Sequence, residues 1–111
     1  IKKLIEFEFN YLEFMGFGID LSECALTGTT DSLEWVSPKS GRAVNSKAGK
    51  RWSKKLLKLP PFLLDKKIDA DKNDLIDGLN LTGHFLKKQI YSDLNKDLPS
   101  SRKKIIDSLK N

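Results

Sequence analysis

The first fifteen residues are densely apolar, and their spacing fits two different elements. Residues 5–11 alternate between apolar and polar side chains as a strand would, whereas the apolar positions of 1–15 also fit one side of a helix. That set comprises Ile1, Leu4, Ile5, Tyr11, Leu12, Phe14 and Met15. The length of the run and the Gly16-Phe17-Gly18 sequence after it favour a helix, because glycine closes helices at little steric cost.

A short hairpin is predicted between residues 33 and 44. Leu33–Ser37 has strand character, Pro38–Gly41 is a turn sequence, and Arg42–Val44 returns. A lone hairpin is only marginally stable in water, so this one is expected to pack against helices. Residues 49–58 predict a short helix or an ordered loop, and Pro60-Pro61 ends regular structure before a helical turn at 62–64.

The second half of the chain has helical periodicity. Asp71 or Asn73 is expected to N-cap a long helix that runs to about Ser92. Its apolar stripe comprises Leu75, Leu79, Thr82, Leu86 and Ile90, supported by Ile76, Phe85 and Leu94. Gly78 and Gly83 lie inside this helix, where close packing explains glycine best.

A last helix is predicted to begin at Pro99, with three of its residues turned inward: Ile105, Ile106 and Leu109. These elements make a mainly α fold, a small helical domain with a short β-hairpin insert. A length of 111 residues fits one domain over 1–111, with the hairpin lobe at about 21–53. No apolar run approaches the length that spans a bilayer, which predicts a soluble protein.

Charge is distributed unevenly along the chain, whose net charge is +5. Residues 1–34 sum to −5, residues 35–64 hold eight bases and no acid, and residues 65–111 sum to +2. Phosphate backbones respond to such a concentration of positive charge, although a solvated lysine-rich surface has the same composition. The predicted DNA-facing cations are Lys39, Arg42, Lys47, Lys50, Arg51, Lys54 and Lys55. Trp35 and Trp52 of the same segment are candidate base-stacking residues or, alternatively, core anchors of the lobe.

The sequence offers no catalytic constellation, so we expect a protein that is not an enzyme. His84 has no recognisable nucleophile or orienting partner and is expected to be a packing or surface residue. Cys24 has no basic neighbour in sequence to lower its pKa. One cysteine excludes an internal disulfide and fits a reducing compartment. One histidine and one cysteine are too few for a structural zinc site, so neither a metal nor a cofactor is expected.

Five blocks of sequence, in order, resemble the C-terminal part of the bacterial recombination mediator RecO: 16–28, 36–44, 59–63, 81–86 and 98–102. The resemblance implies a helical domain with a small zinc-finger-like lobe, following an N-terminal OB-fold that this chain lacks. The absence of Met at position 1 agrees with a fragment. Many members carry two C-x-x-C pairs, whose positions are occupied here by Cys24, Thr27, Asn45 and Ala48. We therefore expect a zinc-less lobe, held by apolar contacts of Leu26, Leu33, Trp35 and Val44.

The resemblance also implies a function in DNA gap repair. Members of the RecO family bind single- and double-stranded DNA in the bacterial cytoplasm, at the nucleoid, and anneal complementary strands. They load RecA with RecR and often RecF, and they contact the C-terminal tail of single-strand DNA-binding protein. The alternative interpretation is a protein-interaction domain whose basic face recognises such an acidic peptide tail, while the missing OB-fold binds the DNA.

Overall fold

The N-terminal segment forms a helix, α1 (Lys2–Phe14), as predicted. In the computed structural model, which describes residues 1–91 and 98–110, Gly16 follows the C-cap of α1 with φ of +87°. The N–H of Gly16 donates to the Glu13 carbonyl at 3.0 Å, and that of Phe17 donates to the Leu12 carbonyl at 2.8 Å. These bonds satisfy carbonyls that the end of a helix leaves without partners, in a backbone conformation that favours glycine.

The buried face of α1 differs from the predicted one. Ile5, Glu8 and Leu12 point into the protein. Five of the seven residues predicted on the inner side are exposed, namely Ile1, Leu4, Tyr11, Phe14 and Met15. The spacing from Ile5 to Leu12 places Glu8 on the same face, and an apolar periodicity cannot select a carboxylate for burial.

The predicted hairpin is present as β1 (Leu33–Val36) and β2 (Ala43–Asn45), with Gly41 at φ of +71° in the turn between them. A third strand, β3 (Leu57–Lys58), pairs with the other edge of β1, so that the antiparallel sheet has the order β2-β1-β3. A helix or loop was predicted there, and for residues 57–58 this was wrong. A two-residue strand has no readable periodicity and forms only because β1 offers it an edge.

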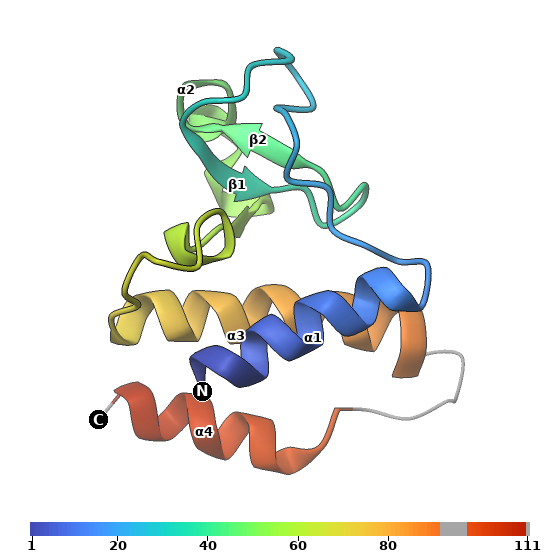
Figure 1. The fold of residues 1–111 in the computed structure, drawn as a ribbon, viewed down its shortest axis with the longest axis vertical. Helices are drawn as coiled ribbons and strands as arrows, with labels where there is room; N and C mark the ends of the chain where they lie inside the picture. Colours follow the sequence, from blue (N-terminus) through green and yellow to red (C-terminus); the bar gives the residue numbers. More distant parts are fainter. Residues whose placement is uncertain (92–97, 111) are drawn as a thin grey trace.

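Two short helical segments lie between β2 and β3, α2 (Ser46–Gly49) and the 3₁₀ helix η1 (Lys50–Lys55). We call residues 20–58, with these elements and the sheet, the small lobe. The loop before β1 joins it through a parallel bridge between Asp20 and Arg42. Figure 1 shows the small lobe stacked on a layer formed by the long helices.

Helix α3 (Lys72–Leu86) begins at the predicted cap. The Asp71 carboxylate accepts from the N–H of Asp74 at 2.8 Å, and the Asp74 carboxylate accepts from the N–H of Asp71 at 3.2 Å. This reciprocal pair satisfies donors that the start of a helix leaves open. The chain continues as a π-helical turn (Lys87–Tyr91), whereas the predicted end at Ser92 and the contact of Leu94 lie outside the described residues.

The last helix, α4 (Ser100–Lys110), starts directly after Pro99. Its Ile105, Ile106 and Leu109 are half-buried against a cluster of Ile5, Phe62 and Leu79, as predicted. Phe62 comes from a 3₁₀ turn, η2 (Pro61–Leu63). This cluster joins α1, α3, α4 and η2 beneath the small lobe.

A second cluster joins α3 to the small lobe. Leu81 and Phe85 of α3 are buried together with Val36 and Ala43 of the hairpin. Helix α3 is therefore buried on two sides. On the side that faces the lobe, the prediction contained Phe85 and Leu86 but not Leu81. The fold is mainly α with a small sheet, as predicted. No helix among the described residues is long and apolar enough to cross a membrane.

Candidate nucleic-acid interface

The structure gathers part of the predicted basic surface around a groove in the small lobe. One wall is the β1–β2 turn, residues 37–40, and the other is η1. We call this space, about 370 Å³ in volume, the turn–η1 groove. Its lining combines Trp52, Lys39 and Lys55 with the apolar side chains of Ala25, Leu26, Pro38, Val44 and Leu56. None of the ten lining residues is acidic.

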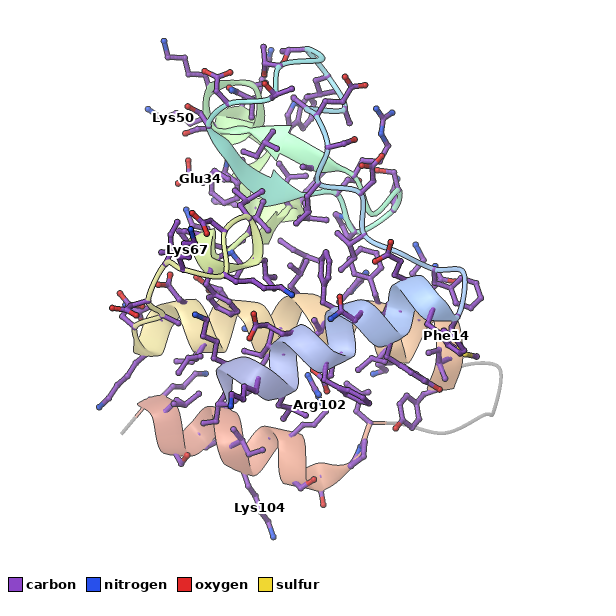
Figure 2. The ribbon with its side chains drawn as sticks, in the orientation of Figure 1. Phe14, Glu34, Lys50, Lys67, Arg102 and Lys104 are labelled. Carbon is purple, nitrogen blue, oxygen red and sulfur yellow. The ribbon has the colours of Figure 1, made fainter. Side chains whose placement is uncertain are left out.

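The remaining predicted cations lie elsewhere on the small lobe. Arg42 is within 3.8 Å of the Glu23 carboxylate, a half-exposed ion pair. Lys47 lies in α2, and Lys50, Arg51 and Lys54 lie in η1, all of them exposed. Figure 2 places Lys50 at the α2 end of the lobe, opposite the β1–β2 turn. The predicted cations therefore cover the lobe on more than one side.

The two tryptophans occupy different environments. Trp35 is half-buried, with its indole N–H donating to the Ser46 carbonyl at 3.4 Å and the Lys58 ammonium 4.6 Å from its ring centroid. Lys58 also pairs with Glu34, and the hydrogen bond from Lys58 is the main cause that lowers the pKa of Glu34. Trp52 is 47 % exposed, and only Arg51, 5.5 Å from its ring centroid, lies over it among the cations described. Trp52 thus presents more ring surface to a ligand than Trp35 does.

Leu26 is not a core contact of the lobe, contrary to the expectation. It is 61 % exposed and lies in the turn–η1 groove, whereas Leu33 and Val44 are buried as expected. The segment from Cys24 to Gly28 forms a tight turn closed by the Gly28 N–H, which donates to the Cys24 carbonyl at 2.9 Å. This turn directs Leu26 outward, beside Trp52.

The β1–β2 turn is held from outside the lobe. His84 Nε2 lies 3.2 Å from the Pro38 carbonyl, and the Lys88 ammonium donates to the same carbonyl at 3.0 Å and to that of Lys39 at 3.1 Å. Since a carbonyl only accepts, Nε2 carries the proton of this bond. His84 is half-buried, with its ring edge-on to Phe85. No sequence signal connects residues 46 to 50 positions apart, so this anchoring was not predicted.

The residues at the degenerate zinc positions do not fit a zinc ion. Only Cys24 supplies a thiolate, and Ala48 supplies no donor at all. The side-chain oxygen of Asn45 accepts from the N–H of Lys47 at 2.9 Å and of Ala48 at 3.4 Å, and its amide donates to the Asp31 carbonyl at 3.1 Å. Among the described residues, no three His, Cys, Asp or Glu side chains are grouped as metal ligands.

The Cys24 thiol is buried, and its sulfur accepts hydrogen bonds from the backbone. The N–H of Asn45 donates to Sγ at 3.1 Å and the N–H of Leu26 at 3.4 Å. Burial alone raises the pKa of Cys24, but these bonds and those from Thr27 outweigh it and lower the pKa to about 7. This lowered pKa was not expected from the sequence, because a distant backbone donor such as the N–H of Asn45 leaves no signal there.

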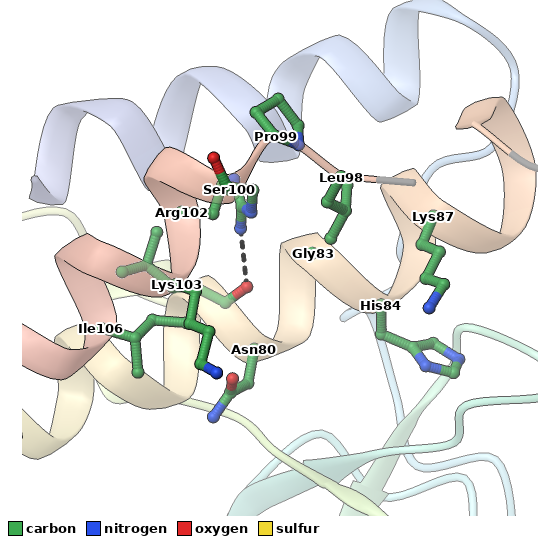
Figure 3. Close-up of a pocket in the computed structure, with 11 residues that line it drawn as sticks. Asn80, Gly83, His84, Lys87, Leu98, Pro99, Ser100, Arg102, Lys103 and Ile106 are labelled. Atoms are coloured by element: carbon green, nitrogen blue, oxygen red, sulfur yellow. Dashed lines mark hydrogen bonds between the residues drawn. The ribbon is translucent and has the colours of Figure 1, made fainter. Parts of the chain in front are cut away.

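A second groove, about 460 Å³ in volume, lies between α3 and α4 (Figure 3). At its inner side the Arg102 guanidinium donates to the Leu79 carbonyl at 2.8 Å and pairs with Glu8 of α1. Glu8 also accepts from the Thr82 hydroxyl at 2.7 Å. This buried network ties α1, α3 and α4 together, and its polar groups are already paired with one another.

Comparison with known proteins agrees with the sequence resemblance. Residues 2–98 match the family described as Recombination protein O C terminal. The chain is 49 % identical over 105 residues to a protein named DNA repair protein RecO from Phenylobacterium zucineum. The aligned residues cover 95 % of the chain and 43 % of that relative. It is 45 % identical over 105 residues to the protein of that name from Caulobacter vibrioides NA1000, with the same coverage. For Acidiphilium cryptum the identity is 46 % over 109 residues, 96 % of the chain and 43 % of the relative.

The chain thus spans less than half the length of the curated relatives it matches. No solved structure matches it at a comparable level. The family match covers most of the chain, including α1, the small lobe and α3. The chain belongs to the RecO C-terminal family.

Proposed function

We propose that this chain acts in DNA repair as the C-terminal domain of a RecO protein, and that its small lobe is a non-catalytic DNA-binding surface. The curated relatives are named for DNA repair. The observation that carries the lobe's part in this proposal is that residues 35–58, which hold all eight bases of the acid-free segment, fold into the small lobe.

The charge of the small lobe suits a polyanion. Residues 20–58 hold eight bases and four acids, and two of those acids are paired with Arg42 and Lys58. Six further cations are exposed and have no salt-bridge partner among the described residues: Lys39, Lys47, Lys50, Arg51, Lys54 and Lys55. Exposed lysines and arginines of this kind neutralise phosphates and release counterions.

The finer roles follow from the family. We propose that the complete protein anneals complementary strands and, with RecR and RecF, helps to load RecA. The tail of single-strand DNA-binding protein is a further proposed partner, because an acidic peptide would also meet the basic face of the lobe.

Charge reversal tests the DNA surface. The variant Lys50→Glu, Arg51→Glu, Lys54→Glu replaces three exposed cations of η1 with acids. If each neutralises a phosphate, the slope of log K against log salt for duplex DNA should decrease by about 2 to 3. Arg42 is left out because its reversal would place two carboxylates together. Fluorescence anisotropy with labelled duplex over a salt series measures the slope.

A matched control changes the net charge by the same amount elsewhere. Lys67→Glu, Lys72→Glu, Lys104→Glu reverses three exposed lysines outside the small lobe. We expect its salt slope to remain near that of the original chain. If the η1 variant remains folded and keeps both affinity and slope, the DNA site lies elsewhere and recognition of an acidic peptide becomes the better interpretation of the lobe.

A further inference from the structure

The turn–η1 groove joins exposed apolar surface to cations on opposite walls. Trp52 is 47 % exposed and Leu26 is 61 % exposed, and both line the groove. Lys39 stands on the β1–β2 turn and Lys55 on η1, so a positive charge flanks the apolar surface on each side. Large side chains exposed together in a groove favour a ligand with an apolar face and negative charges around it.

Single-stranded nucleic acid has that chemistry. Each unpaired base offers a flat face for an aromatic ring, and a phosphate precedes and follows it along the strand. In a duplex the base faces are stacked on their neighbours, so the ring of Trp52 cannot reach them unless the pair opens. A duplex can therefore engage the cations of the small lobe but not the interior of the groove.

The walls of the groove are held in place before any ligand arrives. The Ser37 hydroxyl accepts from the N–H of Lys39 at 3.3 Å and of Ser40 at 3.4 Å. His84 and Lys88 hold the carbonyl of Pro38 from the side of the long helix. A preformed site loses less conformational entropy on binding, which favours a small, flat ligand group such as a base.

An acidic peptide with an apolar side chain is the competing occupant, and the arrangement of charges favours the nucleic acid. The two cations stand on opposite walls, as the phosphates on the two sides of one nucleotide require. Arg51 lies 5.5 Å from the ring centroid of Trp52, which adds a guanidinium to the stacking platform.

We infer that the turn–η1 groove binds an unpaired nucleobase by stacking on Trp52, with Lys39 and Lys55 on the adjoining phosphates, and so gives the small lobe a preference for single strands. This inference rests on the proposed function, because it assigns a substrate class to the same DNA-binding lobe. Leu26 supplies the second apolar contact for the base.

The test compares a labelled oligothymidylate with a blunt hairpin duplex. Trp52→Ala should weaken oligothymidylate binding roughly 5- to 150-fold, the range for one lost base stack, and change duplex binding by less than about twofold. Trp52→Phe keeps an aromatic face and should retain most of the affinity. Leu26→Ser alters a residue that the fold leaves exposed, and it should weaken only the oligothymidylate.

Phe14→Ala serves as the matched control, since Phe14 is an exposed aromatic residue of α1 that lies outside the groove lining. It should bind both probes like the original chain. Equal weakening of both probes by Trp52→Ala, or no weakening of either, would overturn the inference. The inference would also be overturned if a peptide of Asp and Phe residues bound the chain and lost affinity in Trp52→Ala, while the affinity for oligothymidylate stayed unchanged.

Failure of this inference can be told apart from failure of the proposed function. If reversal of Lys50, Arg51 and Lys54 lowers the salt slope but Trp52→Ala spares both probes, the lobe binds DNA without a base pocket. If the reversal changes neither probe, the DNA-binding lobe itself is wrong.

Discussion

The pairing of Glu8 with Arg102 gives a sharp prediction about the stability of the fold. Both side chains are about nine-tenths buried, each with 11 % of its side-chain surface exposed. Glu8→Leu leaves a buried guanidinium without its carboxylate, and Arg102→Met leaves the reverse. Removing one partner of a buried pair costs about 3 to 5 kcal/mol, because the remaining charge stays uncompensated.

The double variant should be far more stable than the two single costs predict. In the double variant the Thr82 hydroxyl, which loses Glu8, can still donate to the Gly78 carbonyl, 3.0 Å away. The Leu79 carbonyl, which loses Arg102, still belongs to the hydrogen-bonded backbone of α3. No polar group is then left unpaired, and apolar replacements for a buried ion pair are often neutral. The coupling energy of the cycle should therefore reach about 3 kcal/mol or more.

Urea unfolding followed by circular dichroism measures these differences. A domain of this size has about 5 to 15 kcal/mol of stability, so each single variant should lose a large fraction of it. With a urea slope of about 1 to 3 kcal/mol per M, the midpoint should fall by about 1 to 5 M. Single costs below about 1 kcal/mol, or costs that add in the double variant, would refute the role assigned to this pair.

Three further predictions concern Gly83, Cys24 and the zinc content of the chain. An added Cβ at Gly83 would lie 3.0 Å from Nη2 of Arg102, which its hydrogen bond to the Leu79 carbonyl holds in place. Gly83→Ala should therefore destabilise the chain by about 1 to 3 kcal/mol in urea unfolding, although alanine has the better helix propensity. The folded-state pKa of Cys24, about 7, lies below its usual 9.0. The stability that the Cys24 thiolate contributes to the fold is therefore fully present above pH 9.0 and is lost as the pH falls through 7. As the pH rises from 7 to 9.0, the free energy of unfolding of the original chain in urea should increase by about 2 to 3 kcal/mol relative to that of Cys24→Ala. Metal analysis after dialysis should find no stoichiometric zinc, because Asn45 is bonded to the backbone and Ala48 has no donor.

The predictable parts of the fold are those with local causes. The cap at Asp71, the glycine stop at Gly16 and the turn at Gly41 each depend on a few adjacent residues, and each was located from the sequence. The β1–β2 hairpin has the same kind of cause, because a turn sequence lies between two short strand-like runs.

The parts that could not be predicted depend on distant partners. Glu8 and Arg102 are 94 positions apart, and neither residue type signals burial by itself. β3 exists only beside β1, and the outward position of Leu26 depends on the loop that docks on the sheet. The basic segment was identified from composition. The sequence does not show which of its cations line the groove and which lie elsewhere on the lobe, because this depends on how the segment folds.

Hydrogen bonds and close packing hold the small lobe together around the degenerate zinc position, and this has a consequence for its function. Asn45 caps α2 while its own N–H bonds the sulfur of Cys24, so one residue fixes both sides of the degenerate zinc position. An added Cβ at Gly49 would lie 2.5 Å from Cδ1 of Trp35, which shows how closely α2 packs on the sheet. The groove that holds Trp52 follows directly from this packing, because η1 continues from α2. The geometry of the proposed DNA surface therefore depends on the polar and apolar contacts of the lobe, where a zinc lobe would depend on its ion.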